Sequence, residues 1–159
     1  MLLNTIRLGE VEIDEEKLVL FPEGVPGFEE KRAFAILTPD EDMPFSFLQS
    51  MEDGDLSFIV ANPFVYFPDY GFELPVSVRN ELNISNEEDV TVICTVSINE
   101  KDEFSLNLLA PIVINSNERL GKQVILHNSK YSTKHIINLS LQEEPHKAEQ
   151  ITVGEDFSC

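Results

Sequence analysis

The side chains that could carry out catalysis are few and stand apart from one another in the sequence. The histidines are His127, His135 and His146, and the cysteines are Cys94 and Cys159. A hydrolase needs a nucleophile beside a positioned base, and the chain contains neither G-x-S-x-G nor H-E-x-x-H. His135 stands at the start of a predicted strand, where we expect a surface or hydrogen-bonded histidine. We therefore predict that the protein is not an enzyme.

Acidic runs and a glycine-rich segment are the remaining candidates for ligand binding. The acids at 41–42 and 52–55 lack the spaced oxygen ligands of a calcium loop, and the two cysteines have no metal spacing. Residues 21–28 contain two prolines and two glycines, but no Lys or Ser/Thr follows at P-loop spacing. This composition predicts a tight loop that binds no phosphate. We expect neither a metal nor a cofactor.

The charge of the chain restricts its partners. It has 29 acidic and 11 basic residues, which gives a formal net charge of -18. Phosphate backbones are bound by clusters of Lys and Arg. We therefore expect that this protein does not bind nucleic acid directly. Two interpretations of the acidity stay open. It keeps the surface soluble, or its field attracts a basic protein partner and keeps RNA away from it.

Length and cysteine content predict one intracellular domain. A chain of 159 residues buries about two thirds of its unfolded surface without disulfides. Both cysteines are interpreted as reduced thiols of a cytoplasmic protein. The first residues lack the apolar region of a signal peptide, and no segment has the length of a membrane span. We expect a single β domain over 1–141 and an acidic, mobile or loosely docked tail over 142–159.

The most apolar run is 107–115, NLLAPIVIN, and we expect it to line the core. Its β-branched second half and Pro111 predict two buried strand segments joined at a bend or bulge, because proline cannot donate a hydrogen bond within a sheet.

Other elements follow from periodicity and turn residues. A helix is predicted at 74–82, where Leu74, Val78 and Leu82 share one face, and 85–88 has the spacing of a capping box. Strands are predicted at 5–13 and 17–21 as an opening hairpin, at 33–37, at 44–50 and 56–61 as a second hairpin, at 89–98, at 104 onward, at 123–126 and at 135–141. The fold class is all-β, a barrel or sandwich of many short strands with one short helix near 75–82.

Five aromatic rings lie within the nine residues 64–72. They either plug one end of the core or form a partly exposed surface that anchors a partner.

Six segments in order resemble the flagellar assembly factor FliW family. The resemblance extends over 6–137, and its motifs are FPEGVPGFE, PFSFLQS, FIVANP, NLLAPIVIN, GKQVIL and YSTKH. It implies a compact antiparallel β-barrel-like fold and a non-enzymatic cytoplasmic protein of flagellated bacteria. It also implies two partners, the terminal helical region of flagellin and the RNA-binding translational repressor CsrA. Free FliW proteins bind CsrA and stop it repressing flagellin mRNA, and accumulating flagellin captures them and frees CsrA.

Within these motifs and the aromatic segment we predict partner contacts. The candidates are Phe45, Phe47, Gln49, Asn62, Tyr66, Phe67, Tyr70, Phe72, Asn107, Asn115 and Gln123. The polar ones could instead cap backbone groups at bends. The alternative function is a small-ligand-binding β-barrel with an aromatic-lined pocket. A closed cavity would favour that alternative, whereas a filled core with an exposed apolar patch favours the adaptor.

Overall fold

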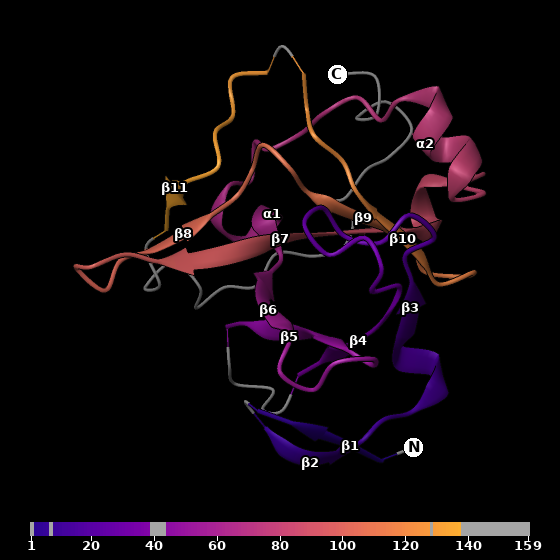
Figure 1. The fold of residues 1–159 in the computed structure, drawn as a ribbon. Coiled ribbons are helices and arrows are strands. Elements are labelled where there is room, and N and C mark those ends of the chain that lie inside the picture. Colours follow the sequence, from indigo (N-terminus) through magenta and orange to yellow (C-terminus); the bar gives the residue numbers. More distant parts are fainter. Residues whose placement is uncertain (1, 7, 39–43, 128, 138–159) are drawn as a thin grey trace.

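The computed structural model describes residues 2–6, 8–38, 44–127 and 129–137, and these residues form mainly β-strands (Figure 1). The strands are β1 (Leu2–Thr5), β2 (Gly9–Glu12), β3 (Leu18–Leu20), β4 (Ala33–Leu37), β5 (Ser46–Ser50), β6 (Ser57–Ala61), β7 (Val90–Ile98), β8 (Phe104–Leu106), β9 (Ile112–Asn115), β10 (Leu120–Gln123) and β11 (His135–Ile136). The helical elements are α1 (Pro63–Tyr66), α2 (Val76–Glu81) and the 3-10 turns η1 (Glu15–Lys17) and η2 (Glu87–Asp89). None of the described helices is long and apolar enough to cross a membrane.

Seven of the strands close into a barrel. Their order is β7-β6-β5-β4-β3-β10-β9, and β9 pairs again with β7. The pairings are antiparallel except between β3 and β10, where Leu20 lies opposite Leu120 in a parallel bridge. The β-barrel-like fold expected from the sequence is thus confirmed, with that one exception. The predicted helix is confirmed as α2, and α1 is a second short helix that the sequence did not predict.

Strand β7 is buried on both faces and separates two apolar clusters. Ile93 points into the barrel, whose interior is filled by Val19, Phe21, Val25, Phe34, Leu48, Val60, Ile93, Ile112 and Ile114. Val92 and Cys94 point to the other side, into a larger cluster beneath the helices. Figure 1 shows both α-helices on the opposite side of β7 from the β1–β2 hairpin. Cys94 is fully buried, and burial raises the pKa of its thiol.

The apolar run 107–115 has the predicted bend, but only the second of its two predicted strand segments forms a strand, as β9. β8 and β9 both pair with β7, β8 near its C-terminal end and β9 near its N-terminal end. The bend between them occupies 107–111, so 107–110 is not a strand. Asn107 explains this, because its Oδ1 accepts hydrogen bonds from the amides of Leu109 (3.1 Å) and Ala110 (3.0 Å) and turns the chain. Leu108 and Ile112 are buried, which confirms that the run lines the core.

Two strand predictions were wrong. The opening hairpin is β1–β2, and β3 pairs with β4 and β10 instead. Thr5 closes the hairpin turn, because its hydroxyl donates to the carbonyl oxygen of Gly9 and accepts from the amide of Leu8, both at 2.9 Å. The strand predicted at 123–126 is β10, which begins three residues earlier. Gly121 lies within β10, where an added Cβ would come 2.9 Å from the Phe21 ring, so this strand position requires a glycine.

The remaining predictions agree more closely with the structure. The second hairpin, β5–β6, and strands β4 and β7 are confirmed, and Leu74, Val78 and Leu82 are buried along one face of α2. The capping-box spacing at 85–88 does precede a helical turn, η2, but that turn has no side-chain cap. Residues 138–141 of the predicted last strand and the tail 142–159, with His146 and Cys159, lie outside the described residues, as do the acids at 41–42.

Candidate functional site

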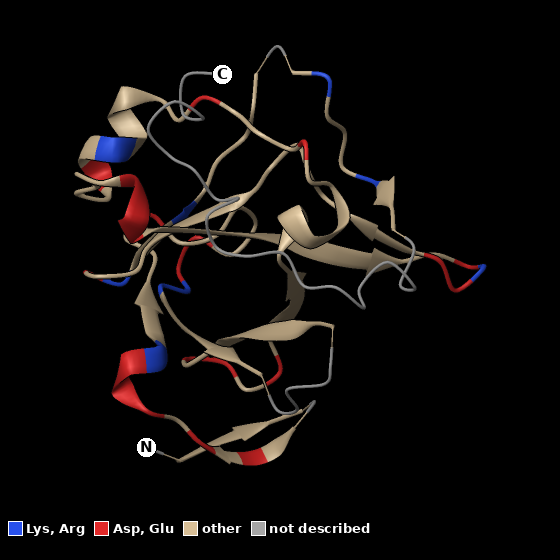
Figure 2. Cartoon of the chain, turned by 180° about the vertical axis from the view of Figure 1, so that it is seen from behind, with Lys and Arg blue, Asp and Glu red and all other residues tan. Residues whose placement is uncertain are grey.

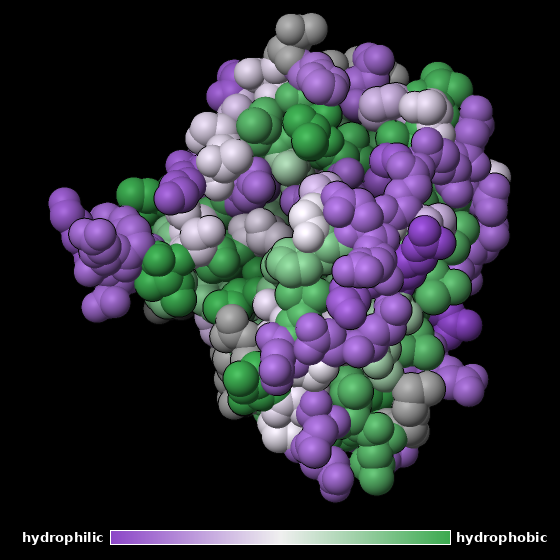
Figure 3. Space-filling model, viewed as in Figure 1, coloured by the Kyte–Doolittle hydropathy of each residue, from purple (hydrophilic) through white to green (hydrophobic). Residues whose placement is uncertain are grey.

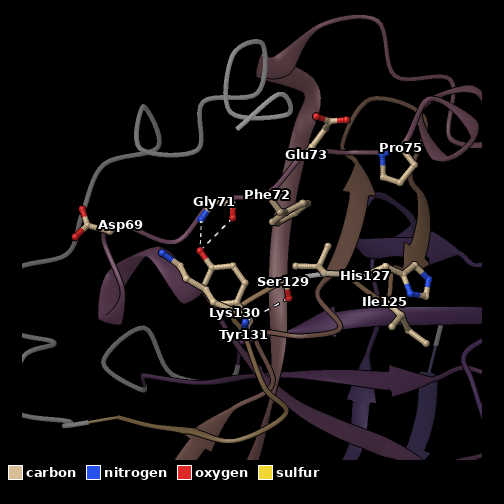
Figure 4. Close-up of a pocket in the computed structure, with 11 residues that line it drawn as sticks. Asp69, Gly71, Phe72, Glu73, Pro75, Ile125, His127, Ser129, Lys130 and Tyr131 are labelled. Atoms are coloured by element: carbon tan, nitrogen blue, oxygen red, sulfur yellow. Dashed lines mark hydrogen bonds between the residues drawn. The ribbon is translucent and has the colours of Figure 1, made fainter.

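A groove of about 540 Å³ lies between the segment that follows α1 and the loop that follows β10 (Figure 4). We call it the aromatic groove. Its lining is Asp69, Gly71, Phe72, Glu73, Pro75, Ile125, Leu126, His127, Ser129, Lys130 and Tyr131. A smaller hollow of about 240 Å³ shares Asp69, Lys130 and Tyr131 with the groove and extends it to Tyr66, Phe67 and His135. The two form one continuous surface.

Helix α1 positions the first wall of the groove. Asn62 caps it, because its Oδ1 accepts a hydrogen bond from the Phe64 amide at 2.9 Å, and Pro63 occupies the first helical turn. The helix is one turn long and ends at Tyr66. The Tyr70 amide then bonds to the Phe67 carbonyl at 2.9 Å, which turns the chain toward the groove.

Tyr70 anchors this wall to the bend at 107–111. Its hydroxyl donates to the carbonyl oxygen of Leu108 at 2.8 Å. The ring is 5% exposed and packs against Phe64, Phe72 and Tyr131, with centroids 5.7, 5.6 and 4.7 Å away. Burial raises the pKa of Tyr70, so the hydroxyl remains a neutral donor.

Tyr131 supplies the second wall, and the sequence analysis missed it. Its hydroxyl donates to the Gly71 carbonyl oxygen at 3.1 Å and accepts from the Gly71 amide at 3.2 Å (Figure 4). The ring meets Tyr70 edge-on, at an interplanar angle of 74°. The available signal was one aromatic residue in the otherwise polar loop 127–132, within the YSTKH motif.

His135 is a hydrogen-bonded histidine, as predicted. Its Nε2 accepts a hydrogen bond from the Ser132 amide at 2.9 Å, which places the proton of the neutral ring on Nδ1. The ring lies 5.7 Å from that of Phe67 and 6.1 Å from that of Tyr131. It therefore forms part of the aromatic wall of the hollow.

The predicted aromatic contact residues divide between core and surface. Tyr66 and Tyr70 are buried and plug the end of the larger apolar cluster. Phe67 and Phe72 are half-buried at the surface of the hollow and groove. The core-plug interpretation thus holds for Tyr66 and Tyr70, and contact of Phe67 and Phe72 with a partner stays a prediction.

The predicted contacts on β5 do not line the groove. Phe45 is buried against Phe104, with ring centroids 5.2 Å apart, and Phe47 packs into the cluster beneath the β1–β2 hairpin. Gln49 is 1% exposed, and its Nε2 lies within 3.3 Å of the carbonyl oxygens of Asp53, Gly54 and Leu56. It holds the turn between β5 and β6.

The other predicted polar residues also bond to the backbone at bends. Asn115 is 2% exposed, and its Nδ2 donates to the carbonyls of Leu82 (2.7 Å) and Asn83 (3.1 Å). Gln123 donates to the Ala110 carbonyl at 3.0 Å. It also lines a separate cavity of about 300 Å³ between the 21–28 loop and strands β6 and β7. These bonds match the capping role, and direct contact with a partner stays a prediction.

Hydrophobic and charged residues are distributed unevenly over the surface of the molecule. Figure 3 shows hydrophobic residues gathered on the upper part of the molecule, below the loop that follows β10. Ile125, which lines the groove, is 53% exposed. Figure 2 shows acidic residues on η1 and the β1–β2 hairpin, whereas the loop before β11 carries lysines. The lining of the groove itself combines apolar side chains with charged ones, which are Asp69, Glu73 and Lys130.

Comparison with known proteins gives a consistent result. Residues 2–137 match the family model described as FliW protein. The flagellar assembly factor FliW of Alkaliphilus metalliredigens is 39% identical over 152 residues, 94% of each chain. That of Bacillus subtilis is 44% identical over 138 residues, which are 86% of this chain and 96% of the relative. A crystal structure of the flagellar assembly factor FliW matches with a TM-score of 0.79 at 41% identity, over 86% of this chain and 96% of that one.

Proposed function

The chain belongs to the FliW family of flagellar assembly factors, and we propose that it is a non-enzymatic cytoplasmic protein that binds flagellin and the translational regulator CsrA. In this proposal the protein switches between its two partners. The free protein binds CsrA and relieves repression of flagellin mRNA, and accumulating flagellin captures the protein and frees CsrA again. The relatives' role as flagellar assembly factors supports the flagellar role, and the family resemblance supplies the two partners.

The observation that carries the proposal is an open aromatic groove beside a filled barrel. Phe21, Phe34 and Leu48 are fully buried in the barrel interior, which is where a ligand-binding barrel would keep its cavity. The groove instead opens to solvent, because most of its rim is exposed. This combination favours the adaptor over the small-ligand binder.

We place the flagellin helix in the aromatic groove. An amphipathic helix buries its apolar face in a hydrophobic groove, and Phe67, Phe72 and Ile125 present apolar surface there. A charge at Ile125 would be buried in the complex without a counter-ion, which is costly. Ile125→Glu should therefore abolish the flagellin pull-down while leaving the melting temperature unchanged.

Ile98 provides a matched control for that variant. It is 50% exposed, like Ile125, but lies at the end of β7 outside the groove lining. Ile98→Glu should retain flagellin. Equal loss of binding in both variants would contradict the placement of flagellin in the groove.

We propose that the negative charge of the protein contributes to antagonism of CsrA. A domain with a formal charge of -18 beside a basic RNA-binding surface lowers RNA affinity by repulsion, without occupying the RNA groove. Because salt screens this field, antagonism should weaken between low and physiological ionic strength. An antagonism that is indifferent to salt would refute the electrostatic part of the proposal.

Co-purification from the bacterial cytoplasm tests the function as a whole. The tagged full-length chain should recover flagellin and CsrA, each identified by mass spectrometry. Recovery of neither partner would refute the proposed function, even though family and fold would stand.

A further inference from the structure

The barrel has a gap between β6 and β7. The two strands pair only where Val60 lies opposite Thr95 and at the next position along. In the other direction the same register would place Ile59 opposite Val96, but the described strands do not pair there. Figure 1 shows that β6 meets β7 steeply, at one end of β6. The cavity of about 300 Å³ between the 21–28 loop and these strands lies at this place, and we call it the gap cavity.

Both strands present an edge to the gap cavity. Phe58 and Ile59 pair with β5 on one side of β6 and also line the cavity. Val96 and Ser97 pair with β8 on one side of β7 and line the cavity as well. A strand edge without a neighbouring strand is a template for the backbone of an added one. The gap cavity therefore suits an extended segment that adds to these edges.

The lining of the gap cavity suits an uncharged occupant. Val25, Phe58 and Ile112 give it apolar surface, Thr95 and Ser97 carry hydroxyl groups, and none of the described residues that line it is charged. One turn of α-helix, about 10 Å wide and 5 Å long, takes up about 400 Å³, which is more than the cavity holds. The occupant that fits is thus an extended segment with apolar side chains.

The C-terminal tail of this chain contains such a segment. Within 142–159 the longest run without a charged residue is 150–154, QITVG. Its three central residues are β-branched and therefore favour a strand. Ile151 and Val153 would point to the same side of that strand, because side chains alternate along it.

The tail is long enough to reach the gap cavity. The described part of the chain ends at Ile137, directly after β11. Ile136 lies opposite Ser105 of β8, which lies opposite Ser97 at the cavity. Two strand spacings, about 10 Å, therefore separate β11 from the strand that borders the cavity. The intervening residues 138–150 span up to about 43 Å when extended.

We propose that the tail binds in the gap cavity as a strand, with Ile151 and Val153 buried between β6 and β7. Thr152 then faces outward. The bound strand fills the gap in the barrel and keeps the five acidic residues of 142–159 close to it. This contact within the chain depends on neither flagellin nor CsrA.

Amide hydrogen exchange of the full-length chain tests this proposal. We expect residues 151–153 to exchange at least about tenfold more slowly than in an unstructured peptide of the same sequence. Ile151→Asp/Val153→Asp would place two charges in an uncharged cavity, which is costly. This variant should lose the protection of 151–153 and accelerate exchange at 58–59 and 96–97.

A second tail variant is the matched control. Ala148→Asp/Gln150→Asp makes the same charge change at the same spacing, outside the pair of side chains assigned to the cavity. We expect it to leave the exchange of 151–153, 58–59 and 96–97 within about twofold of the unchanged protein.

A variant of the cavity tests the contact from the other side. Ser97 is exposed and lines the gap cavity, so Ser97→Phe would fill part of the space that the tail needs. It should release 151–153 as the double aspartate variant does. Thermal melting verifies that each variant folds, and the tail variants change no residue of the barrel.

The outcomes decide the inference separately from the proposed function. Protection of 151–153 that is lost in the double aspartate variant and in Ser97→Phe, but kept in the control, supports the inference. Unprotected residues 151–153 in the unchanged protein would overturn it. Protection that survives Ser97→Phe would also overturn it, because the tail would then bind elsewhere. All these results leave the proposed function standing, since neither partner is present.

Discussion

The hydroxyl group of Tyr131 both donates to and accepts from the backbone of Gly71, at 3.1 and 3.2 Å. This reciprocal pair joins the loop after β10 to the segment after α1, which is 60 residues earlier in the chain. The ring also packs edge-on against Tyr70. One side chain therefore holds the two walls of the aromatic groove at their spacing.

Removal of the Tyr131 hydroxyl should weaken both the fold and the groove. Tyr131→Phe keeps the ring contact but loses two hydrogen bonds, so we expect the free energy of unfolding to fall by about 1–2 kcal/mol. Urea denaturation measures this loss, and flagellin affinity should fall with it. Tyr66→Phe is the matched control, because the buried Tyr66 hydroxyl has no hydrogen-bond partner among the described residues. It should be neutral or stabilising, and an equal loss in both variants would contradict the assignment.

Asn115 should be a major contributor to stability. Besides its two donated bonds, its Oδ1 accepts from the amides of Asn117 (3.0 Å) and Glu118 (3.1 Å). Asn115→Ala leaves the buried Leu82 carbonyl and three part-buried backbone groups without these bonds, and we expect a loss of about 2–4 kcal/mol in urea denaturation. Asn80→Ala, at an exposed position of α2, should change stability by less than about 0.5 kcal/mol. Similar effects at the two positions would show that Asn115 is not a structural cap.

Glu52 should make stability depend on pH on the acid side. Hydrogen bonds from the amides of Ala33 (2.9 Å) and Arg32 (2.6 Å) lower the pKa of Glu52 below its ordinary value of 4.5. The contribution of the carboxylate is therefore present above pH 4.5 and is lost as the pH falls through the lower pKa of the folded state. Glu52→Gln should be less stable than the unchanged protein at neutral pH, and the difference should shrink below pH 4.5. A difference in urea midpoint that is constant with pH would contradict this.

Gly54 should control the docking of the β1–β2 hairpin. Its carbonyl oxygen accepts from the Ile6 amide at 3.0 Å, and a Cβ at Gly54 would collide with the Asn4 carbonyl oxygen. We expect Gly54→Ala to displace the hairpin at a cost of about 1–3 kcal/mol. Amide hydrogen exchange should accelerate in β1 and β2 but not in β7. Asp55→Ala, at the exposed position that follows Gly54, is the control. Uniform acceleration of hydrogen exchange throughout the barrel in Gly54→Ala would contradict local undocking of the hairpin.

The candidate site was only partly predictable. Phe67 and Phe72 were found because aromatic rings crowd the segment 64–72, and both lie at the groove or hollow. Tyr131 was missed because a single ring in a polar loop has no periodicity. Gln49 and Asn115 were predicted as partner contacts with backbone capping as the alternative, and the structure shows the capping bonds, which depend on turns that only the folded chain forms.

By itself, the sequence determined the β class, the alternating strand β7, the bend at Pro111, the helix near 75–82 and the family. These features are local, because side-chain alternation and turn residues act over a few positions. The tertiary structure alone decided which strands close the barrel and which residues form the groove. Leu20 pairs with Leu120, and Gly71 bonds to Tyr131, across separations that no local pattern records. Such contacts form only when closure of the barrel brings distant segments together, so the site depends on the whole fold.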